Sequence, residues 1–253
     1  MDKPTFKLLQ GHLLIGPPAS GKTTVAKIMA EIFQAEIIST DAIRKDIYGD
    51  EKVQGIWSEI YIQLKNKILD CINLKKDFII DATNVKRAWR LNLTQNLTYT
   101  KELEWIGWWL NTPKDKCIDW NKNRERIIQD NLINDYWEIL NDKNFGPSIS
   151  EGFTDLRIID PYSEKIDASF FKSEIKKIKL SIIERRKNYP DKDQLHDYSA
   201  LIDLERLIFL INFLSNNPYP EFNEDSILEN ARQYLIKKHG SCYGDHEKIK
   251  QDF

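Results

Sequence analysis

The residues best suited to chemistry form a short segment near the N-terminus, Gly16-Pro17-Pro18-Ala19-Ser20-Gly21-Lys22-Thr23. Its two glycines are separated by four residues and followed by Lys and Thr, which is the spacing of a phosphate-binding loop. Glycines let the backbone turn tightly and point successive N–H groups at phosphate oxygens. Lys22 can then reach the β- and γ-phosphates of ATP, and the Thr23 hydroxyl can ligate Mg²⁺. We therefore predict that residues 16–24, through Thr24, bind ATP.

A carboxylate and an arginine follow about one strand–helix unit later. Asp41 comes just after a predicted strand at residues 36–39, and Arg44 lies one helical turn further on, on the same face. Asp41 could take the proton from an acceptor hydroxyl, and Arg44 could hold an anionic acceptor or orient Asp41. The alternative is that Asp41 caps the helix that follows, a position that Asp favours. We predict that Lys22, Asp41 and Arg44 are catalytic.

Asp81 ends a strand at residues 78–81 that is apolar until this acidic residue. A carboxylate at that point is suited to holding Mg²⁺ together with Thr23, so we predict Thr23 and Asp81 as the metal residues. The alternative is a capping Asp before a solvated basic helix.

Arg124 and Arg126 lie near the end of a helix predicted over residues 114–129. Phosphoryl transfer spreads charge over the equatorial oxygens, so an arginine delivered to them accelerates the reaction. We predict that this helix end closes as a lid, with Arg124 catalytic and Arg126 a contact to ATP. The spacing leaves open which of the two is the catalytic lid arginine. The alternative is that both cations simply pair with the helix dipole.

Strands and helices must alternate to position these residues, and the hydrophobic pattern predicts that they do. Strands are expected at residues 13–15, 36–39, 78–81, 103–110 and 156–159, and helices at 22–33, 41–48, 55–74, 87–97 and 114–129. This order predicts an α/β fold of the P-loop NTPase kind, with three α/β/α layers around a mostly parallel five-stranded sheet. Ligands bind beyond the carboxyl ends of such strands, where the polar residues above are found.

The pattern changes at about residue 164. Three helices are predicted, at residues 172–186, 198–214 and 225–238, separated by Asn- and Pro-rich breakers. We therefore predict a kinase domain at residues 1–163 and a helical appendage at 164–253. The central helix is apolar over most of its circumference, and we expect the flanking helices, including the Ile178 and Ile182 face, to cover it. The appendage either packs on the first domain or binds a protein partner or a second copy.

Composition excludes several classes of protein. The net charge is −2, so a strongly basic coat for nucleic acid is absent, although local patches remain. No apolar run approaches the length of a membrane span, and the N-terminus has no apolar signal core. Three scattered cysteines suit a reducing compartment, so we predict a cytoplasmic protein without membrane contact.

Together these segments resemble the phage-type polynucleotide 5′-kinases and related small P-loop kinases, the zeta-toxin-like and chloramphenicol-phosphotransferase-like group. The resemblance covers residues 11–160 and rests on 16–23, Ser39-x-Asp41-x-x-Arg44, Asp81-x-Thr83-Asn84 and Pro113…Asn121-x-x-Arg124. It implies Asp41 as general base, Arg44 as an acceptor contact and Arg124 as the arginine on the donor phosphates. Glu125, between the two lid arginines, departs from the usual small residue. No Asp-x-Asp-x-Thr pattern follows residue 160, so 3′-phosphate removal is not expected.

The resemblance implies an ATP-dependent kinase that transfers the γ-phosphate to a hydroxyl. Residues 86–126 contain nine basic and five acidic side chains, and residues 165–187 contain eight and three. Such patches favour a polyanionic acceptor, so we predict a polynucleotide or nucleotide 5′-hydroxyl. One alternative is a small-molecule kinase acting on a sugar, a nucleotide sugar or an antibiotic. Another is an ATP-dependent switch that acts through the helical appendage.

Overall fold

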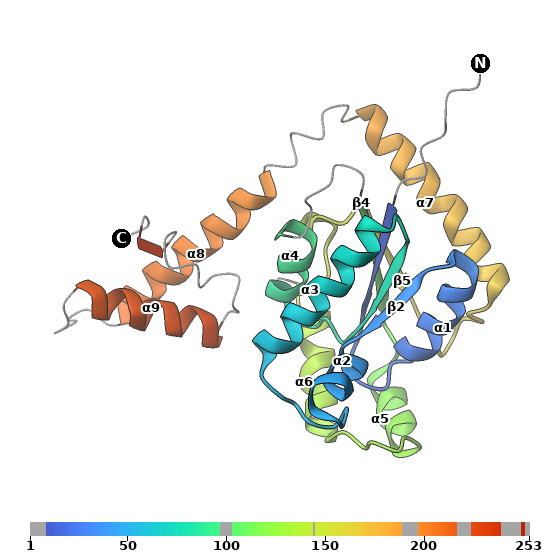
Figure 1. The fold of residues 1–253 in the computed structure, drawn as a ribbon, viewed down its shortest axis with the longest axis horizontal. Helices are drawn as coiled ribbons and strands as arrows, with labels where there is room; N and C mark the ends of the chain where they lie inside the picture. The colour runs from blue at the N-terminus through green and yellow to red at the C-terminus, as the bar shows by residue number, and fades with distance from the viewer. Residues whose placement is uncertain are drawn as a thin grey trace.

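The computed structural model describes residues 9–96, 103–143, 145–188, 197–216, 224–238 and 249–250. At its centre is a five-stranded sheet in the order β2-β3-β1-β4-β5 (Figure 1). The strands are β1 (Leu9–Ile15), β2 (Glu36–Ser39), β3 (Phe78–Asp81), β4 (Leu103–Leu110) and β5 (Asp155–Ile159). Every neighbouring pair is parallel, so the predicted α/β sheet is confirmed.

Successive residues of the strands face opposite sides of this sheet. In β1, Leu13 and Ile15 belong to one buried cluster and Leu14 to another. The first cluster is covered by α2 (Thr40–Tyr48), α3 (Trp57–Asn73), α4 (Arg87–Asn96) and α6 (Asp130–Asn141), and the second by α1 (Lys22–Phe33) and α7 (Ala168–Asn188). Figure 1 shows α3 and α4 on one side of the strands and α1 and α7 on the other. The predicted three-layer α/β/α arrangement is therefore confirmed.

The helix predicted over residues 114–129 is wrong in extent. Helix α5 (Lys114–Lys122) ends well before residue 129, and α6 begins at Asp130, where no helix was predicted. Residues 122–126 are all polar or charged, so a helix continued through them would have no apolar face to bury. Arg124 and Arg126 consequently lie in a loop between two helices and not on a helix end.

The C-terminal helices α8 (Asp197–Asn216) and α9 (Glu224–Lys238) pack against α4. Their shared cluster contains Ala88, Leu91, Leu210, Leu228, Ala231, Leu235 and Ile249. Although α8 is the most apolar of these helices, no helix in the described ranges combines the length and hydropathy needed to cross a membrane.

Helix α7 does not cover α8 as expected. Its residues Phe171, Ile178 and Ile182 are buried with α1 and β4 on the second face of the sheet. The boundary between residues 163 and 164 remains a prediction. Helix α7 supplies part of the core on the second face of the sheet.

Candidate active site

The phosphate-binding loop leaves the carboxyl end of β1 and enters α1. A Cβ atom at Gly16 would lie 2.6 Å from Ser20 Oγ, and Gly21 has a φ of +93°, so neither position suits a larger residue. The Gly16 amide donates to the Thr83 carbonyl oxygen at 3.0 Å. The loop is thereby tied to the segment that follows β3.

Lys22 is the first residue of α1, and its side chain folds back over the loop. Its Nζ donates to the Pro17 carbonyl oxygen at 2.6 Å and lies 3.3 Å from Ser20 Oγ. Burial lowers the pKa of Lys22 to about 8, although the nearby Asp81 carboxylate acts in the opposite direction. A phosphate next to Nζ would favour the charged ammonium and raise this pKa again.

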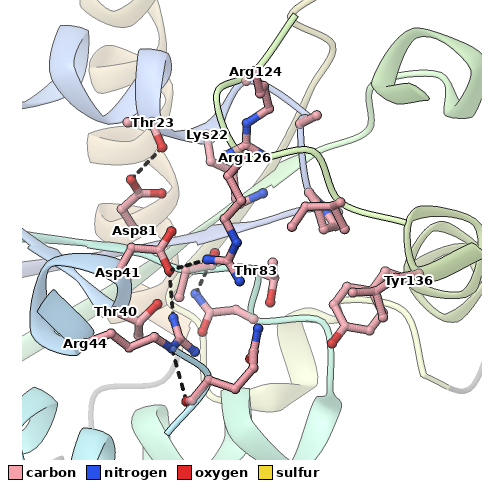
Figure 2. A pocket seen from close by; sticks show the side chains of 18 of the residues that line it. Lys22, Thr23, Thr40, Asp41, Arg44, Asp81, Thr83, Arg124, Arg126 and Tyr136 are labelled. Atoms are coloured by element: carbon pink, nitrogen blue, oxygen red, sulfur yellow. Dashed lines mark hydrogen bonds and ion pairs between the residues drawn. The ribbon is translucent and has the colours of Figure 1, made fainter. Parts of the chain in front are cut away.

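Thr23 and Asp81 face each other across the sheet edge. The Thr23 hydroxyl donates to Asp81 Oδ2 at 2.9 Å (Figure 2). Asp81 is only 8% exposed, and burial raises its pKa against the opposing effects of Lys22 and Thr23. Within the described ranges no three His, Cys, Asp or Glu side chains cluster around a metal position. A hydroxyl and one carboxylate fit Mg²⁺, which usually takes one or two protein oxygens, with phosphates and water completing its shell.

Asp41 lies in the first turn of α2, but it is not the N-cap of that helix. Ser39 holds the cap position, and its Oγ accepts from the Ala42 amide at 3.4 Å. The Asp41 carboxylate instead accepts from Arg44 NH1 at 2.7 Å, and Arg44 Nε donates to the Gln54 carbonyl oxygen at 3.4 Å. The Asp41 side chain is still 49% exposed, so its carboxylate is oriented and remains accessible to a ligand.

The loop after α5 brings the two lid arginines over the site. Asn121 is fully buried, and its side chain donates to the Ile128 carbonyl oxygen at 2.6 Å and accepts from the Ile128 amide at 3.0 Å. This clamp closes residues 122–127 into a loop. Arg126 reaches from the loop to the Glu51 carbonyl oxygen at 3.2 Å and lies 4.0 Å from Asp41 Oδ1.

The two arginines serve different parts of the site. Arg126 points toward Asp41 (Figure 2). Burial, the largest cause, lowers the pKa of Lys22 and raises the pKa of Asp81, and the charge of nearby Arg124 lowers both pKa values to a smaller extent. Arg124 is therefore on the phosphate side and Arg126 on the side of the proposed base. Their roles in ATP binding and catalysis stay predictions.

One cavity of about 590 Å³ joins these groups. Its phosphate half is lined by the loop and by nearby side chains: Pro18, Ala19, Gly21, Lys22, Thr23, Thr24, Asp81, Trp120 and Arg124. The other half, which we predict to take the acceptor and call the acceptor half, is lined by residues around Asp41: Thr40, Asp41, Arg44, Gln54, Gly55, Trp57, Asn84, Trp89 and Tyr136. Of the predicted nucleotide residues, Gly16, Pro17 and Ser20 are not in the lining. Pro17 and Ser20 instead contact Lys22 Nζ, and Gly16 bonds the Thr83 backbone.

Several lining residues were not predicted as site residues. Trp57 and Trp89 come from separate helices, and no local spacing in the sequence links them. Tyr136 and Leu132 come from α6. The apolar residues of α6, which recur at intervals of three and four, could have signalled an amphipathic helix, but not that it faces the cavity.

The comparisons with known proteins agree with this fold. Residues 12–134 match the family model described as AAA domain. The chain is similar to the structure of a candidate kinase from Chloroflexus aurantiacus, with 14% identity and a TM-score of 0.53 over 68% of this chain and 98% of that one. No curated protein matches the chain.

Weaker likenesses extend to other solved structures. One is a gluconokinase from Sinorhizobium meliloti, with 15% identity and a TM-score of 0.43 over 72% of this chain and 96% of that chain. Another is the Pnkp1/Rnl/Hen1 RNA repair complex, with 17% identity and a TM-score of 0.46 over 54% of this chain and 45% of that chain. The family match over residues 12–134 and the likeness to the Chloroflexus structure show a P-loop kinase-like fold, which confirms the predicted resemblance to small P-loop kinases at the level of the fold.

Proposed function

We propose that this protein is an ATP-dependent phosphotransferase that moves the γ-phosphate of ATP to a hydroxyl group. The observation that carries the proposal is the single cavity that contains both a phosphate-binding loop and an oriented, accessible carboxylate. A protein that only binds or hydrolyses nucleotide has no need of Asp41 held by Arg44 beside a second half of the cavity.

On the phosphate side, the loop amides and the N-terminus of α1 provide positive dipoles for the triphosphate. Lys22 supplies the fixed charge beneath it, and Arg124 supplies a second charge from the loop after α5. Thr23 and Asp81 would hold Mg²⁺, which neutralises charge on the phosphates when bound. Together these groups stabilise the negative charge that develops on the phosphate oxygens in the transition state of the transfer.

On the acceptor side, Asp41 is the proposed general base. The acceptor oxygen forms a bond to the γ-phosphorus, the bond from that phosphorus to the β,γ-bridging oxygen breaks, and the acceptor proton goes to the Asp41 carboxylate. ADP and the phosphorylated acceptor are the products. Arg44 NH1, at 2.7 Å from Asp41 Oδ1, holds the carboxylate in place for this step. A positioned base of this kind contributes roughly 10²–10⁴-fold to the rate.

We further propose a polynucleotide or nucleotide 5′-hydroxyl as the acceptor. Four basic side chains line the cavity, Lys22, Arg44, Arg124 and Arg126, against the two carboxylates Asp41 and Asp81. Arg44 and Arg126 lie on the acceptor side, where a net positive charge favours an acceptor with phosphates of its own.

The test is transfer of label from γ-labelled ATP to a panel of acceptors, with Lys22→Ala as the blank. The panel contains 5′-hydroxyl DNA and RNA oligonucleotides, nucleosides, sugars and nucleotide sugars. Label on 5′-hydroxyl ends that is lost in Lys22→Ala supports the proposal. Label on a sugar alone would establish a small-molecule kinase, and bound ATP without any transfer would favour the nucleotide-dependent switch.

A further inference from the structure

Two tryptophans form an aromatic wall in the acceptor half of the cavity. Trp57 is the first residue of α3, and Trp89 lies in the first turn of α4. Their ring centroids are 4.9 Å apart, and the ring planes are inclined by 22°. Both residues line the same cavity as Asp41. Because the two rings stack on each other, one face of each is covered, and the cavity meets only the parts of the two indoles that stay exposed.

This wall is more exposed than Trp105 and Trp108, although Trp57 also packs against the first buried cluster. Trp105 and Trp108 of β4 are 2% and 0% exposed, as residues buried under helices are. Trp57 and Trp89 are both partly exposed at the cavity. Exposed indole rings next to a site are suited to stacking on a flat ligand, because such a ligand removes their apolar faces from water.

The wall is linked to the proposed base through Arg44 and the segment that precedes Trp57. Arg44 bonds Asp41 with one nitrogen and the Gln54 carbonyl oxygen with another. Gln54 and Trp57 are three residues apart, which the chain can span with at most about 11 Å. Asp41, Trp57 and Trp89 line the same cavity, so one bound molecule can touch the wall and Asp41 together.

The segment that carries Trp57 is fixed by Tyr48. The Ile56 amide donates to the Tyr48 hydroxyl at 2.8 Å, and that hydroxyl donates to Glu59 Oε2 at 2.7 Å. Gly55 has a φ of +63°, and a Cβ atom there would lie 2.1 Å from the Tyr48 ring. The close approach of loop and ring thus depends on glycine, and it sets where Trp57 begins α3.

Charge beside the wall favours an anionic ligand. Lys86 Nζ lies over the Trp89 ring, 5.1 Å from its centre, and Arg44 lines the same cavity. A flat aromatic surface together with cations matches a nucleobase and its neighbouring phosphate.

We infer that Trp57 and Trp89 form a subsite that stacks the 5′-terminal base of a polynucleotide while its 5′-hydroxyl meets Asp41. Lys86 then contacts the phosphate that follows this base. The inference rests on the proposed function and adds to it the residues that select the acceptor. Trp57 and Trp89 act by binding and take no part in the transfer of the phosphoryl group.

The test compares two 5′-hydroxyl oligonucleotides of the same sequence. One has an ordinary 5′-terminal nucleotide, and the other has a tetrahydrofuran abasic residue there, which keeps the 5′-hydroxyl but lacks the base. With the wild-type protein we expect KM for the abasic acceptor to be roughly 5- to 150-fold higher, the range given by loss of one stacked base. The KM for ATP should not change.

Variants of the two tryptophans show whether these residues cause the difference in KM between the two acceptors. In Trp57→Ala and Trp89→Ala the difference between the two acceptors should largely disappear, and Trp57→Phe should retain most of it. Trp120→Ala is the matched control, because Trp120 lines the same cavity beside Gly21 in the phosphate half. It should keep the full difference between the two acceptors. If an alanine variant fails to fold, the comparison on the wild-type protein still decides.

The outcomes separate this inference from the proposed function. Equal KM values for the two acceptors, with efficient transfer to both, would overturn the aromatic subsite and leave the kinase intact. A difference that survives in both alanine variants would also overturn it. Failure to label any 5′-hydroxyl end, in contrast, would refute the proposed acceptor and the inference together.

Discussion

The loop that carries both lid arginines depends on one buried side chain, and replacing it gives a direct test of the site. Asn121→Ala removes the two hydrogen bonds to the Ile128 backbone, at 2.6 and 3.0 Å. The Ile128 amide and carbonyl groups then lose their partner. The rest of α5 should be retained, since Asn121 lies in its last turn. We therefore expect the loop to open while the domain stays folded.

The magnitude follows from the two bonds. Each contributes about 0.5–1.5 kcal/mol net, so their loss disfavours the closed loop by roughly 1–3 kcal/mol. Every 1.4 kcal/mol is a tenfold change in an equilibrium constant. The open fraction of the loop should thus rise by roughly 5- to 150-fold. The rate of phosphoryl transfer should fall only if most Asn121→Ala molecules have the open loop.

Limited trypsin digestion reads the open fraction directly, because cleavage of a transiently open segment follows its population when closing is fast. Trypsin cuts after Arg124 and Arg126, and mass spectrometry can follow these two bonds separately from the others. Asn123→Ala is the matched control, since Asn123 is an exposed residue of the same type in the same loop. Equal cleavage rates at these bonds in the two variants would refute the proposed clamp.

Three further predictions concern the proposed base Asp41, the pKa of Lys22 and the buried ion pair between Arg90 and Glu151. Asp41→Asn should lower phosphoryl transfer roughly 10²–10⁴-fold in single-turnover measurements, while ATP titration shows unchanged affinity. The pKa of Lys22, lowered by burial to about 8, predicts that ATP affinity is constant below pH 8. Above it, affinity should weaken by up to about tenfold per pH unit, because a neutral lysine must regain its proton to bind phosphate. Lys22→Ala should lack this break, and a break that persists in that variant would assign it to another group. Arg90 and Glu151 form a fully buried ion pair, with Nε 2.6 Å from Oε2. Glu151→Gln should therefore reduce the free energy of unfolding by about 3–5 kcal/mol in urea titrations, whereas the exposed Glu125→Gln should change it by less than about 0.5 kcal/mol.

Much of the sheet and the phosphate loop could be predicted because their signals are local. The loop occupies contiguous residues, and its glycines and lysine act on the same few backbone groups. The buried strands are short apolar runs, and β2, β3 and β4 have the predicted ends. Asp81 was placed correctly at the end of β3, because a change from apolar to acidic residues within one strand marks where the strand leaves the core. The sequence therefore determined the five strands and one edge of the sheet as the predicted place for chemistry.

The arrangement of the acceptor half was decided only in three dimensions. Trp57 meets Trp89 because α3 and α4 pack side by side on one face of the sheet, although 31 residues separate the two positions in the sequence. Asn121 bonds Ile128, and this contact ends α5 where a continuous helix was predicted. Helix α7 packs on α1 and the sheet, and not on α8, since a helix face with apolar residues does not specify which partner buries it. Contacts between distant segments depend on packing of the whole chain, and spacing within one segment does not encode them.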